Sequence, residues 1–191
     1  MRSKRFSVNN RQTLISEERM KLQPAEGIIS RMKLSRDDIV ADLGCGIGYV
    51  TIPLSKEVKH VMALDGQQMM LDDLIARTPE DLKGRITPVL SELPELPFEE
   101  SSLDKAVMVN VADEIQYTER MVSEIIRCLK EDGVLTIVDF NKVPLPFGPP
   151  FEEKIPLEDM VRLYSPMELT QKNVFDIYYQ IDLKNNKNLK K

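Results

Sequence analysis

The sequence predicts an α/β domain in which a parallel sheet is covered by helices. From Ile39 onward, short runs rich in Val, Ile, Leu and Met alternate with segments of helical periodicity, and this alternation is typical of parallel sheets. A turn with glycines at alternate positions, Gly44, Gly46 and Gly48, directly follows the first apolar run. The length of 191 residues suits one domain with its own core, so we expect a single unit over residues 1–191.

Each predicted strand is a short apolar run bounded by charged or turn residues. The last one alternates strictly between apolar and polar residues, which predicts a strand with one buried face. Pro88 removes a backbone donor from the third run, so we expect that strand at an edge of the sheet. The predicted strands cover residues 39–43, 60–64, 86–90, 103–109, 134–139 and 175–183.

The predicted helices lie mostly between these strands. The clearest covers residues 118–130, because apolar residues recur at helical spacing, Thr118 can serve as the N-cap and Gly133 follows as a turn residue. A segment with four prolines and a glycine, residues 143–150, is interpreted as a loop crossing one face of the sheet. The other predicted helices cover residues 24–32, 49–57, 67–77 and 157–163.

Composition argues against several classes of function. The net charge of −5 disfavours a broad phosphate-binding surface, so we expect no nucleic-acid partner. Cys45 and Cys128 show no paired spacing and no histidine cluster accompanies them, so we predict neither disulfides nor a metal site. The chain lacks an apolar run of about 20 residues and a signal-peptide pattern. We therefore expect a cytoplasmic protein without a membrane span, whose Lys- and Asn-rich tail, residues 184–191, is disordered.

Polar residues follow four of the predicted strands and should meet at one edge of the sheet. In open α/β sheets, ligands bind outside the carboxyl ends of the strands. The glycine turn, Asp65, Glu92 and Asn110 all fall at such ends. The turn reads GxGxG, and Tyr49 stands where a dinucleotide-binding GxGxxG turn has its third glycine. Because the Asp65 carboxylate can accept hydrogen bonds from both ribose hydroxyls, we predict a nucleoside ligand.

At this point the chain resembles the class I S-adenosylmethionine-dependent methyltransferases, especially the small type 11 group related to ubiquinone and menaquinone biosynthesis. The resemblance covers about residues 14–183 and implies a three-layer, Rossmann-like fold. It also implies a seven-stranded sheet in the order 3-2-1-4-5-7-6, with strand 7 antiparallel. Four motifs carry it: VADLGCGIGYVTIPLS (40–55), ALDGQQMML (63–71), SELPELPFEESSLDKAVMVNV (91–111) and EIIRCLKEDGVLTIVDF (124–140).

The resemblance implies S-adenosylmethionine as cofactor and S-adenosylhomocysteine as product. Asp42 and the backbone of the turn would hold the methionine portion, and Asp65 would bind the ribose hydroxyls. Glu92, where the family often has aspartate, would accept a hydrogen bond from the adenine amino group. The full set of implied cofactor-binding residues is Asp42, Gly44, Cys45, Gly46, Gly48, Asp65, Gly66, Gln67, Glu92, Leu93, Asn110 and Val111.

Transfer of a sulfonium methyl group requires mainly that a nucleophile is held in line and that water is excluded. An obligatory catalytic residue is therefore not expected, although a hydroxyl or phenol acceptor would benefit from a general base. Asp113, Glu114 and Tyr117 follow the fourth strand and Tyr49 follows the glycine turn, so each is a candidate. A solvated loop and a helix start are the alternative interpretations. His60 begins the second strand, away from the predicted site, and is interpreted as structural.

Residues 1–23 and the loop 141–154 resemble the family's variable cover over the acceptor pocket. Phe140, Phe147 and Phe151 would make that pocket aromatic, or would simply attach the loop to the core. We expect methyl transfer to a small-molecule acceptor. Alternatives are a protein or RNA methyltransferase, a non-catalytic S-adenosylmethionine-binding protein and, disfavoured by the glycine spacing, a nicotinamide-dependent oxidoreductase. The sequence leaves open whether the protein forms a homodimer.

Overall fold

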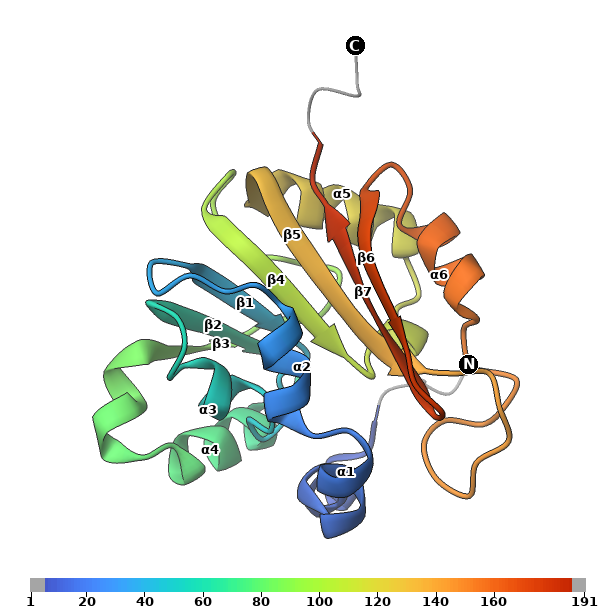
Figure 1. Ribbon diagram of the computed structural model, residues 1–191. Helices are drawn as coiled ribbons and strands as arrows, with labels where there is room; N and C mark the ends of the chain where they lie inside the picture. Colours follow the sequence, from blue (N-terminus) through green and yellow to red (C-terminus); the bar gives the residue numbers. More distant parts are fainter. Residues whose placement is uncertain (1–5, 187–191) are drawn as a thin grey trace.

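The computed structural model describes residues 6–186, and it shows one central sheet with helices on both faces (Figure 1). The sheet has seven strands in the order β3-β2-β1-β4-β5-β7-β6. β7 runs antiparallel to β5 and β6, whereas the pairs among β1 to β5 are parallel. The expected strand order and the antiparallel β7 are confirmed. Residues 1–5 of the expected cover segment and residues 187–191 of the expected tail lie outside the described residues.

The strands are β1 (Ile39–Leu43), β2 (His60–Asp65), β3 (Ile86–Leu90), β4 (Leu103–Val109), β5 (Leu129–Phe140), β6 (Glu168–Val174) and β7 (Tyr178–Lys184). The α-helices are α1 (Glu17–Leu22), α2 (Ala25–Arg31), α3 (Thr51–Leu54), α4 (Gln68–Arg77), α5 (Thr118–Cys128) and α6 (Leu157–Leu163). The 3-10 helices are η1 (Val8–Ile15), η2 (Glu80–Arg85) and η3 (Ala112–Glu114). Within residues 6–186, none of the helices has the length and apolar character to cross a membrane.

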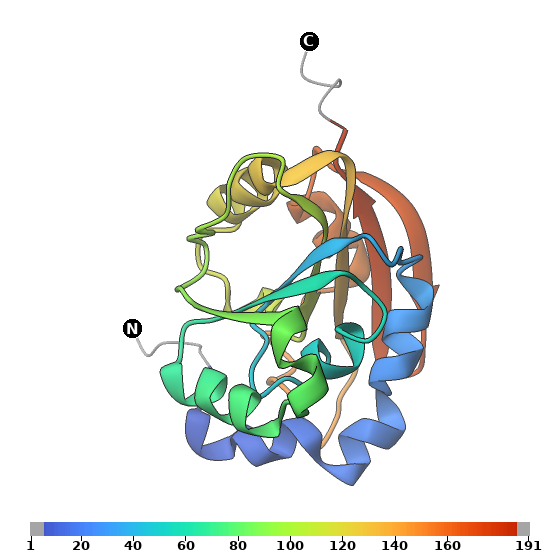
Figure 2. The ribbon, with the colours of Figure 1, turned by 90° about the vertical axis from the view of Figure 1, so that its left-hand side faces the viewer.

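Two apolar clusters fill the spaces between the sheet and its covering layers. On one face, α2, α3 and α4 bury Ile28, Leu54 and Leu74 against the sheet. On the other face, α5 and α6 bury Ile125 and Met160 (Figure 2). Burial of each such side chain contributes about 1.5 to 3 kcal/mol. The central strands are thus enclosed on both faces, and α1 lies beyond their carboxyl ends (Figure 1).

Pro88 lies in β3 and is paired in register with Ala63 of β2. Because β3 is the first strand of the sheet, the missing donor of Pro88 interrupts no ladder on its outer side. The predicted edge position is confirmed. The opposite edge, β6, was not predicted, because its sequence ELTQKNV is polar and lacks a strand-like pattern.

β7 differs from its prediction in both its start and its burial. It begins at Tyr178 rather than Phe175, and residues 178–183 are all buried. Tyr179, Ile181 and Leu183 pack in one apolar cluster and Tyr178 packs in the other, so both faces of β7 are covered and the expectation of one buried face was wrong. The polar side chains of β7 form hydrogen bonds inside the protein, although the buried Gln180 Oε1 has no partner among residues 6–186. Gln180 donates to the Ile28 carbonyl at 3.1 Å, and Asp182 accepts from Thr136 at 2.8 Å.

The helix predicted after the glycine turn is much shorter than expected. Residues 49–57 were predicted to be helical, but α3 contains only Thr51–Leu54. Pro53 explains the difference. A helix from Tyr49 would place Pro53 at its fifth position, where the backbone needs a donor, whereas proline is tolerated in the first turn.

The helix predicted over residues 118–130 ends two residues early, and its caps differ. Tyr117 rather than Thr118 is the N-cap residue. Leu129 already pairs with Leu103, so β5 begins directly after the helix. Gly133 therefore lies inside β5 and does not end the helix.

Ordered structure continues into the segment predicted to be a disordered tail. Lys184 ends β7, and Asn185 is 1% exposed. The Asn185 side chain donates to the carbonyls of Ile126, Leu129 and Lys130 at 3.1 to 3.2 Å. The prediction of disorder was therefore wrong for residues 184 and 185, because Asn185 satisfies carbonyls at the end of α5.

The glycine turn adopts backbone conformations that favour glycine, and the space beside Gly48 is also too small for a side chain. Gly44, Gly46 and Gly48 have φ values of +79°, +52° and +86°. A Cβ atom added to Gly48 would lie 2.4 Å from Leu74 Cδ1 and 3.2 Å from Ile52 Cγ1. Any larger residue at position 48 would push against both α3 and α4.

β5 ends in a buried carboxyl group. Asp139 is 1% exposed, and its Oδ1 accepts the Phe140 amide at 2.7 Å. Its Oδ2 has no hydrogen-bond partner among residues 6–186. Burial, reinforced by the nearby Asp113 carboxylate, raises the pKa of Asp139 to about 8. At neutral pH this side chain is therefore mostly protonated.

We predict that Gly48→Ala lowers the free energy of unfolding by about 1 to 3 kcal/mol, because it combines a strained φ with overpacking. Urea denaturation measures this change. Gly84→Ala is the matched control, since nothing lies within 4 Å of a Cβ at that position. Equal stability of the two variants would contradict the steric role of Gly48.

We predict that Asp139→Asn removes part of the loss of stability that the wild type undergoes as the pH rises from about 4 to about 8. The folded carboxyl holds its proton up to about pH 8, whereas the unfolded one loses it near the ordinary pKa of 3.8. Wild-type stability should therefore fall as pH rises through this window. The variant, which keeps the acceptor for Phe140, should be more stable than wild type by about 1 to 2 kcal/mol above about pH 8.

Urea denaturation across this pH range measures the difference between Asp139→Asn and wild type. Asp81→Asn, at an exposed position of η2, is the control for a general change of charge. Parallel stability curves for wild type and Asp139→Asn would contradict the assignment.

Candidate functional site

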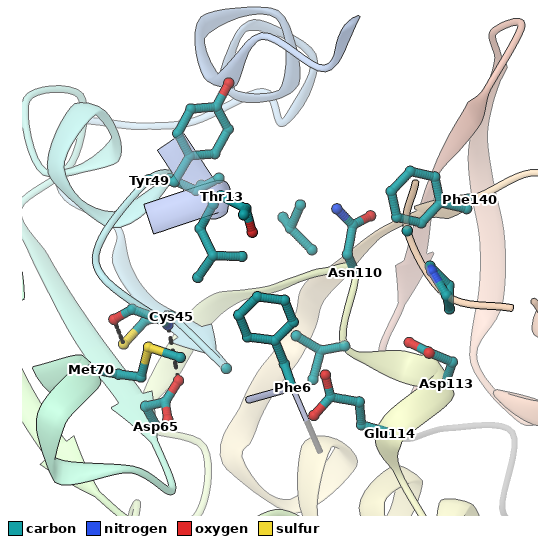
Figure 3. Close-up of a pocket in the computed structure, with 18 of the residues that line it drawn as sticks. Phe6, Thr13, Cys45, Tyr49, Asp65, Met70, Asn110, Asp113, Glu114 and Phe140 are labelled. Atoms are coloured by element: carbon teal, nitrogen blue, oxygen red, sulfur yellow. Dashed lines mark hydrogen bonds between the residues drawn. The ribbon is translucent and has the colours of Figure 1, made fainter. Parts of the chain in front are cut away.

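A cavity of about 820 Å³ opens at the carboxyl ends of the parallel strands (Figure 3). This volume falls within the roughly 300–1,000 Å³ of small-ligand pockets. The segments that follow β1, β2, β3 and β4 all border it, as the strand pattern predicted. The predicted cofactor-binding residues that line it are Asp42, Gly44, Cys45, Gly46, Asp65, Gly66, Gln67, Glu92, Leu93, Asn110 and Val111.

Gly48 is the one predicted cofactor-binding residue that does not belong to this lining. A Cβ atom at Gly48 would meet Leu74 and Ile52, so a glycine at this position is required for the packing of α3 and α4. At Gly44 an added Cβ would lie 2.6 Å from Val111 Cγ2, and at Gly46 it would lie 3.0 Å from a methyl group of η1. The glycines therefore allow other protein segments to pack closely against the turn, and they also leave the cavity wall free of side chains.

Asp42 ends β1 below the turn and is 3% exposed. Its Oδ2 accepts a hydrogen bond from the Thr51 hydroxyl at 2.6 Å, which fixes the start of α3 against the turn. Burial raises the pKa of Asp42 to about 6, and nearby Asp65 adds to the effect, while the Thr51 bond opposes it. Asp42 is thus a buried acid at the floor of the cavity.

Asp65 ties the turn after β1 to the turn after β2. Its Oδ2 accepts the Gly46 amide and its Oδ1 accepts the Gln67 amide, both at 2.9 Å. The side chain lies on the cavity wall beside Cys45 and Met70 (Figure 3). A carboxylate has about four acceptor positions, so it can also accept hydrogen bonds from a bound diol.

Next to Asp65, the cavity wall carries both apolar and polar side chains, a combination that suits the binding of a flat, partly polar ring of a ligand. Gln67 and Met70 come from the start of α4, and Glu92 and Leu93 follow β3. Met70 is 2% exposed and offers an apolar surface, whereas Glu92 is exposed at the rim. Gln67 Nε2 donates to the Phe6 carbonyl at 3.1 Å, which connects this side to the N-terminal segment.

Asn110 follows β4 in a left-handed conformation, with φ of 57°. Its backbone amide donates to the Val138 carbonyl at 2.8 Å. Its side chain forms a reciprocal amide pair with Gln23, with N···O distances of 2.9 and 3.2 Å. Asn110 therefore lines the cavity as predicted and also attaches the N-terminal segment to the end of β4.

The N-terminal segment forms a roof that the sequence indicated only in outline. Arg11 bonds Asp73 of α4 at 2.6 Å and so attaches η1 to the domain. The sequence carries no local signal for these residues, because their partners lie about 60 or more positions away. The roof residues that line the cavity, none of them named from the sequence, are Phe6, Thr13, Leu14, Ser16, Glu18, Arg19, Leu22 and Gln23.

Tyr49 lines the cavity, but its hydroxyl is used by the roof. The hydroxyl donates to the Gln23 carbonyl at 2.8 Å and accepts the Ala25 amide at 3.2 Å. Burial raises the pKa of Tyr49. The Arg19 guanidinium carbon lies 4.5 Å from the centre of its ring. These contacts favour the structural interpretation of Tyr49 over a role as a base.

The other candidate acids line the opposite side of the cavity. Figure 3 shows Asp113, Glu114 and Phe140 on this side, facing Asp65 across the cavity. Tyr117 also lines the cavity, but it is 64% exposed at the rim. Phe147 packs edge-on against Phe140, with ring centres 6.3 Å apart.

Phe151 does not belong to this lining, so of the two alternatives considered for the three phenylalanines, an aromatic cavity wall does not extend to it. It is 45% exposed, and Lys142 lies 5.4 Å from its ring centre. Phe140, Phe147, Pro149 and Pro150 line the cavity in its place.

Histidine and cysteine side chains often act as bases or nucleophiles, but the surroundings of His60 and Cys45 indicate structural roles. His60 begins β2, at the end of the sheet opposite the cavity, and its Nε2 lies 2.8 Å from the Thr87 hydroxyl. Cys45 is buried, and burial together with Asp42 and Asp65 raises the pKa of its thiol. Neither environment favours a nucleophile or a general base.

Comparison with known proteins agrees with this geometry. The sequence model of the family described as "Methyltransferase domain" matches residues 41–137. The chain is 30% identical over 117 residues to demethylmenaquinone methyltransferase of Lactobacillus johnsonii, covering 59% of this chain and 48% of the relative. It is 27% identical over 96 residues to the 23S rRNA (uracil(1939)-C(5))-methyltransferase RlmD of Aliivibrio fischeri, covering 50% and 20%. The chain thus spans half the length of these relatives or less.

A crystal structure of an S-adenosylmethionine-dependent methyltransferase from Aquifex aeolicus superposes with a TM-score of 0.85 at 21% identity. The superposition covers 94% of this chain and 99% of that one, which establishes a shared fold. With about half of its length matched by the family's sequence model, the chain belongs to the methyltransferase domain family and has the class I fold of S-adenosylmethionine-dependent methyltransferases.

Proposed function

We propose that the chain transfers the methyl group of S-adenosylmethionine to a small-molecule acceptor. The observation that carries this proposal is the Asp65 carboxylate. Two backbone amides hold it at the end of β2, on the wall of the cavity. In this fold such a carboxylate is placed to accept hydrogen bonds from ribose hydroxyls. Family membership supports the same ligand.

The residues present fit the parts of this cofactor. Asp65 would bind the ribose, while Gln67, Met70 and the Glu92 segment would border the adenine. Asp42, Asn110 and the glycine turn would surround the methionine portion. The negative charges of Asp42 and Asp65 suit a ligand with a positive sulfonium and an ammonium group. The bound cofactor supplies a methyl group already activated for displacement, so these residues need chiefly to orient the ligands and exclude water.

Acidic side chains on the acceptor side favour a small molecule over RNA. Glu18, Asp113, Glu114 and Glu153 all line the cavity. Carboxylates at these positions would repel a phosphate backbone, whose binding depends on accumulated Lys and Arg contacts. The N-terminal roof also narrows the way in for a folded macromolecule. When the acceptor must lose a proton, Asp113 and Glu114 are the carboxylates that we propose receive it.

We predict that calorimetric titration detects S-adenosylmethionine and S-adenosylhomocysteine but not NAD. Asp65→Ala should weaken both adenosyl ligands at least about tenfold, since a hydrogen bond to a charged group contributes about 1.5 to 3 kcal/mol. Asp65→Asn keeps an acceptor for one backbone amide and shows whether the turn remains folded. Asp72→Ala, at an exposed position of α4, is the control. Tight NAD binding without a response to either adenosyl compound would overturn the proposal.

We predict that labelled methyl groups from S-adenosylmethionine appear in a small-molecule fraction of cell extract. The protein is incubated with extract, which is then separated by ultrafiltration, and the Asp65→Ala protein gives the background. Label that stays with material sensitive to ribonuclease or protease would contradict a small-molecule acceptor. Label in neither fraction would contradict catalysis and favour a protein that only binds the cofactor.

A further inference from the structure

Arg19 presents a cation to the cavity from the roof. It lies in α1, and its guanidinium rests on the Tyr49 ring, 4.5 Å from the ring centre. Its Nη1 donates to the Leu14 carbonyl at 3.1 Å. Its Nε is buried and finds no hydrogen-bond partner within residues 6–186. A guanidinium has five N–H donors, so this side chain retains capacity to bind an acceptor in the cavity.

Arg19 is connected to the glycine turn through Leu14, which contacts both. The same Leu14 that accepts from Nη1 has its Cδ1 3.0 Å from the position of a Cβ on Gly46. Asp42, at the floor below the turn, interacts electrostatically with Arg19. Arg19 and Asp42 thus give this end of the cavity one cation and one buried acid, a charge pattern that matches an amino-acid zwitterion.

The energetics also favour an anionic partner. Burial lowers the pKa of Arg19 to about 10, which the Tyr49 and Asp42 groups oppose, so the side chain stays charged at neutral pH. A buried charged donor without an acceptor is costly, and a carboxylate satisfies a guanidinium in a fork-like geometry. S-adenosylmethionine carries one anionic group, the α-carboxylate of its methionine portion.

We propose that Arg19 binds the α-carboxylate of the cofactor, so that the roof recognises ligands that carry an amino-acid moiety. This inference rests on the proposed function, because it concerns the same cofactor. It assigns to α1 a role in ligand selection: an adenosyl compound without the carboxylate would occupy the Asp65 side of the cavity but lose the contact with the roof.

The test compares two ligands by calorimetry on the full chain. S-adenosylhomocysteine carries the amino-acid moiety, and methylthioadenosine lacks it. Arg19→Gln should weaken S-adenosylhomocysteine about tenfold or more while leaving the affinity for methylthioadenosine unchanged. Arg19→Lys, which keeps the charge but not the planar fork, should show a smaller loss. Arg11→Gln is the matched control, because it breaks the Arg11–Asp73 pair that attaches the same segment and leaves the cavity cation in place.

The possible results separate the two proposals. An equal loss for both ligands in Arg19→Gln, or no loss for either, would overturn the role of Arg19 and leave the proposed function standing. A wild-type protein that binds neither ligand would overturn both. If Arg19→Gln does not fold, decarboxylated S-adenosylhomocysteine tests the wild type directly. It should bind about tenfold more weakly than S-adenosylhomocysteine, and equal affinity would overturn the inference.

Discussion

The contact on which the site depends most is the pair of hydrogen bonds that Asp65 accepts from Gly46 and Gln67. Backbone bonds reinforce it, since the amides of Gly44 and Cys45 both donate to the Leu64 carbonyl, at 2.8 and 2.9 Å. Together they fix the turn after β1 on the end of β2. The edge of the sheet that borders the cavity is therefore a connected unit, in which the carboxylate proposed to bind the ribose also holds the backbone that surrounds it.

The second constraint is the roof. Because of it, the cavity is formed by two parts of the chain, the carboxyl edge of the sheet and the N-terminal segment. Phe6 bonds Gln67, Arg11 bonds Asp73 and Gln23 bonds Asn110, so the N-terminal segment is attached above β2, α4 and β4. These are polar contacts of modest individual strength, about 0.5 to 1.5 kcal/mol each for neutral pairs. The roof is thus attached by polar contacts to three separate elements at the carboxyl edge of the sheet.

Most of the parallel strands followed from local sequence, because parallel strands buried on both faces appear as apolar runs. The strand order and the full set of predicted cofactor-binding residues came from the resemblance to the family. The bounds of β1, β3 and β4 were predicted correctly, and Pro88 located the edge. The predictions were wrong or incomplete where contacts between residues far apart in the sequence determine the structure. Burial on both faces of β7 depends on its neighbours, and the requirement for Gly48 depends on Leu74 of another helix. Arg19 was missed for the same reason, since nothing near it in sequence marks it as facing the glycine turn.

Within residues 6–186, the cavity combines acids from the strand ends with the Arg19 cation from the roof, and this distribution of charge suits the proposed cofactor. A crystal structure of the protein with S-adenosylhomocysteine tests this account of ligand binding most directly. The account predicts the ribose hydroxyls within hydrogen-bond distance of the Asp65 carboxylate and the homocysteine carboxylate at the Arg19 guanidinium. A nucleoside bound away from Asp65, or a cavity left empty at saturating ligand, would contradict it.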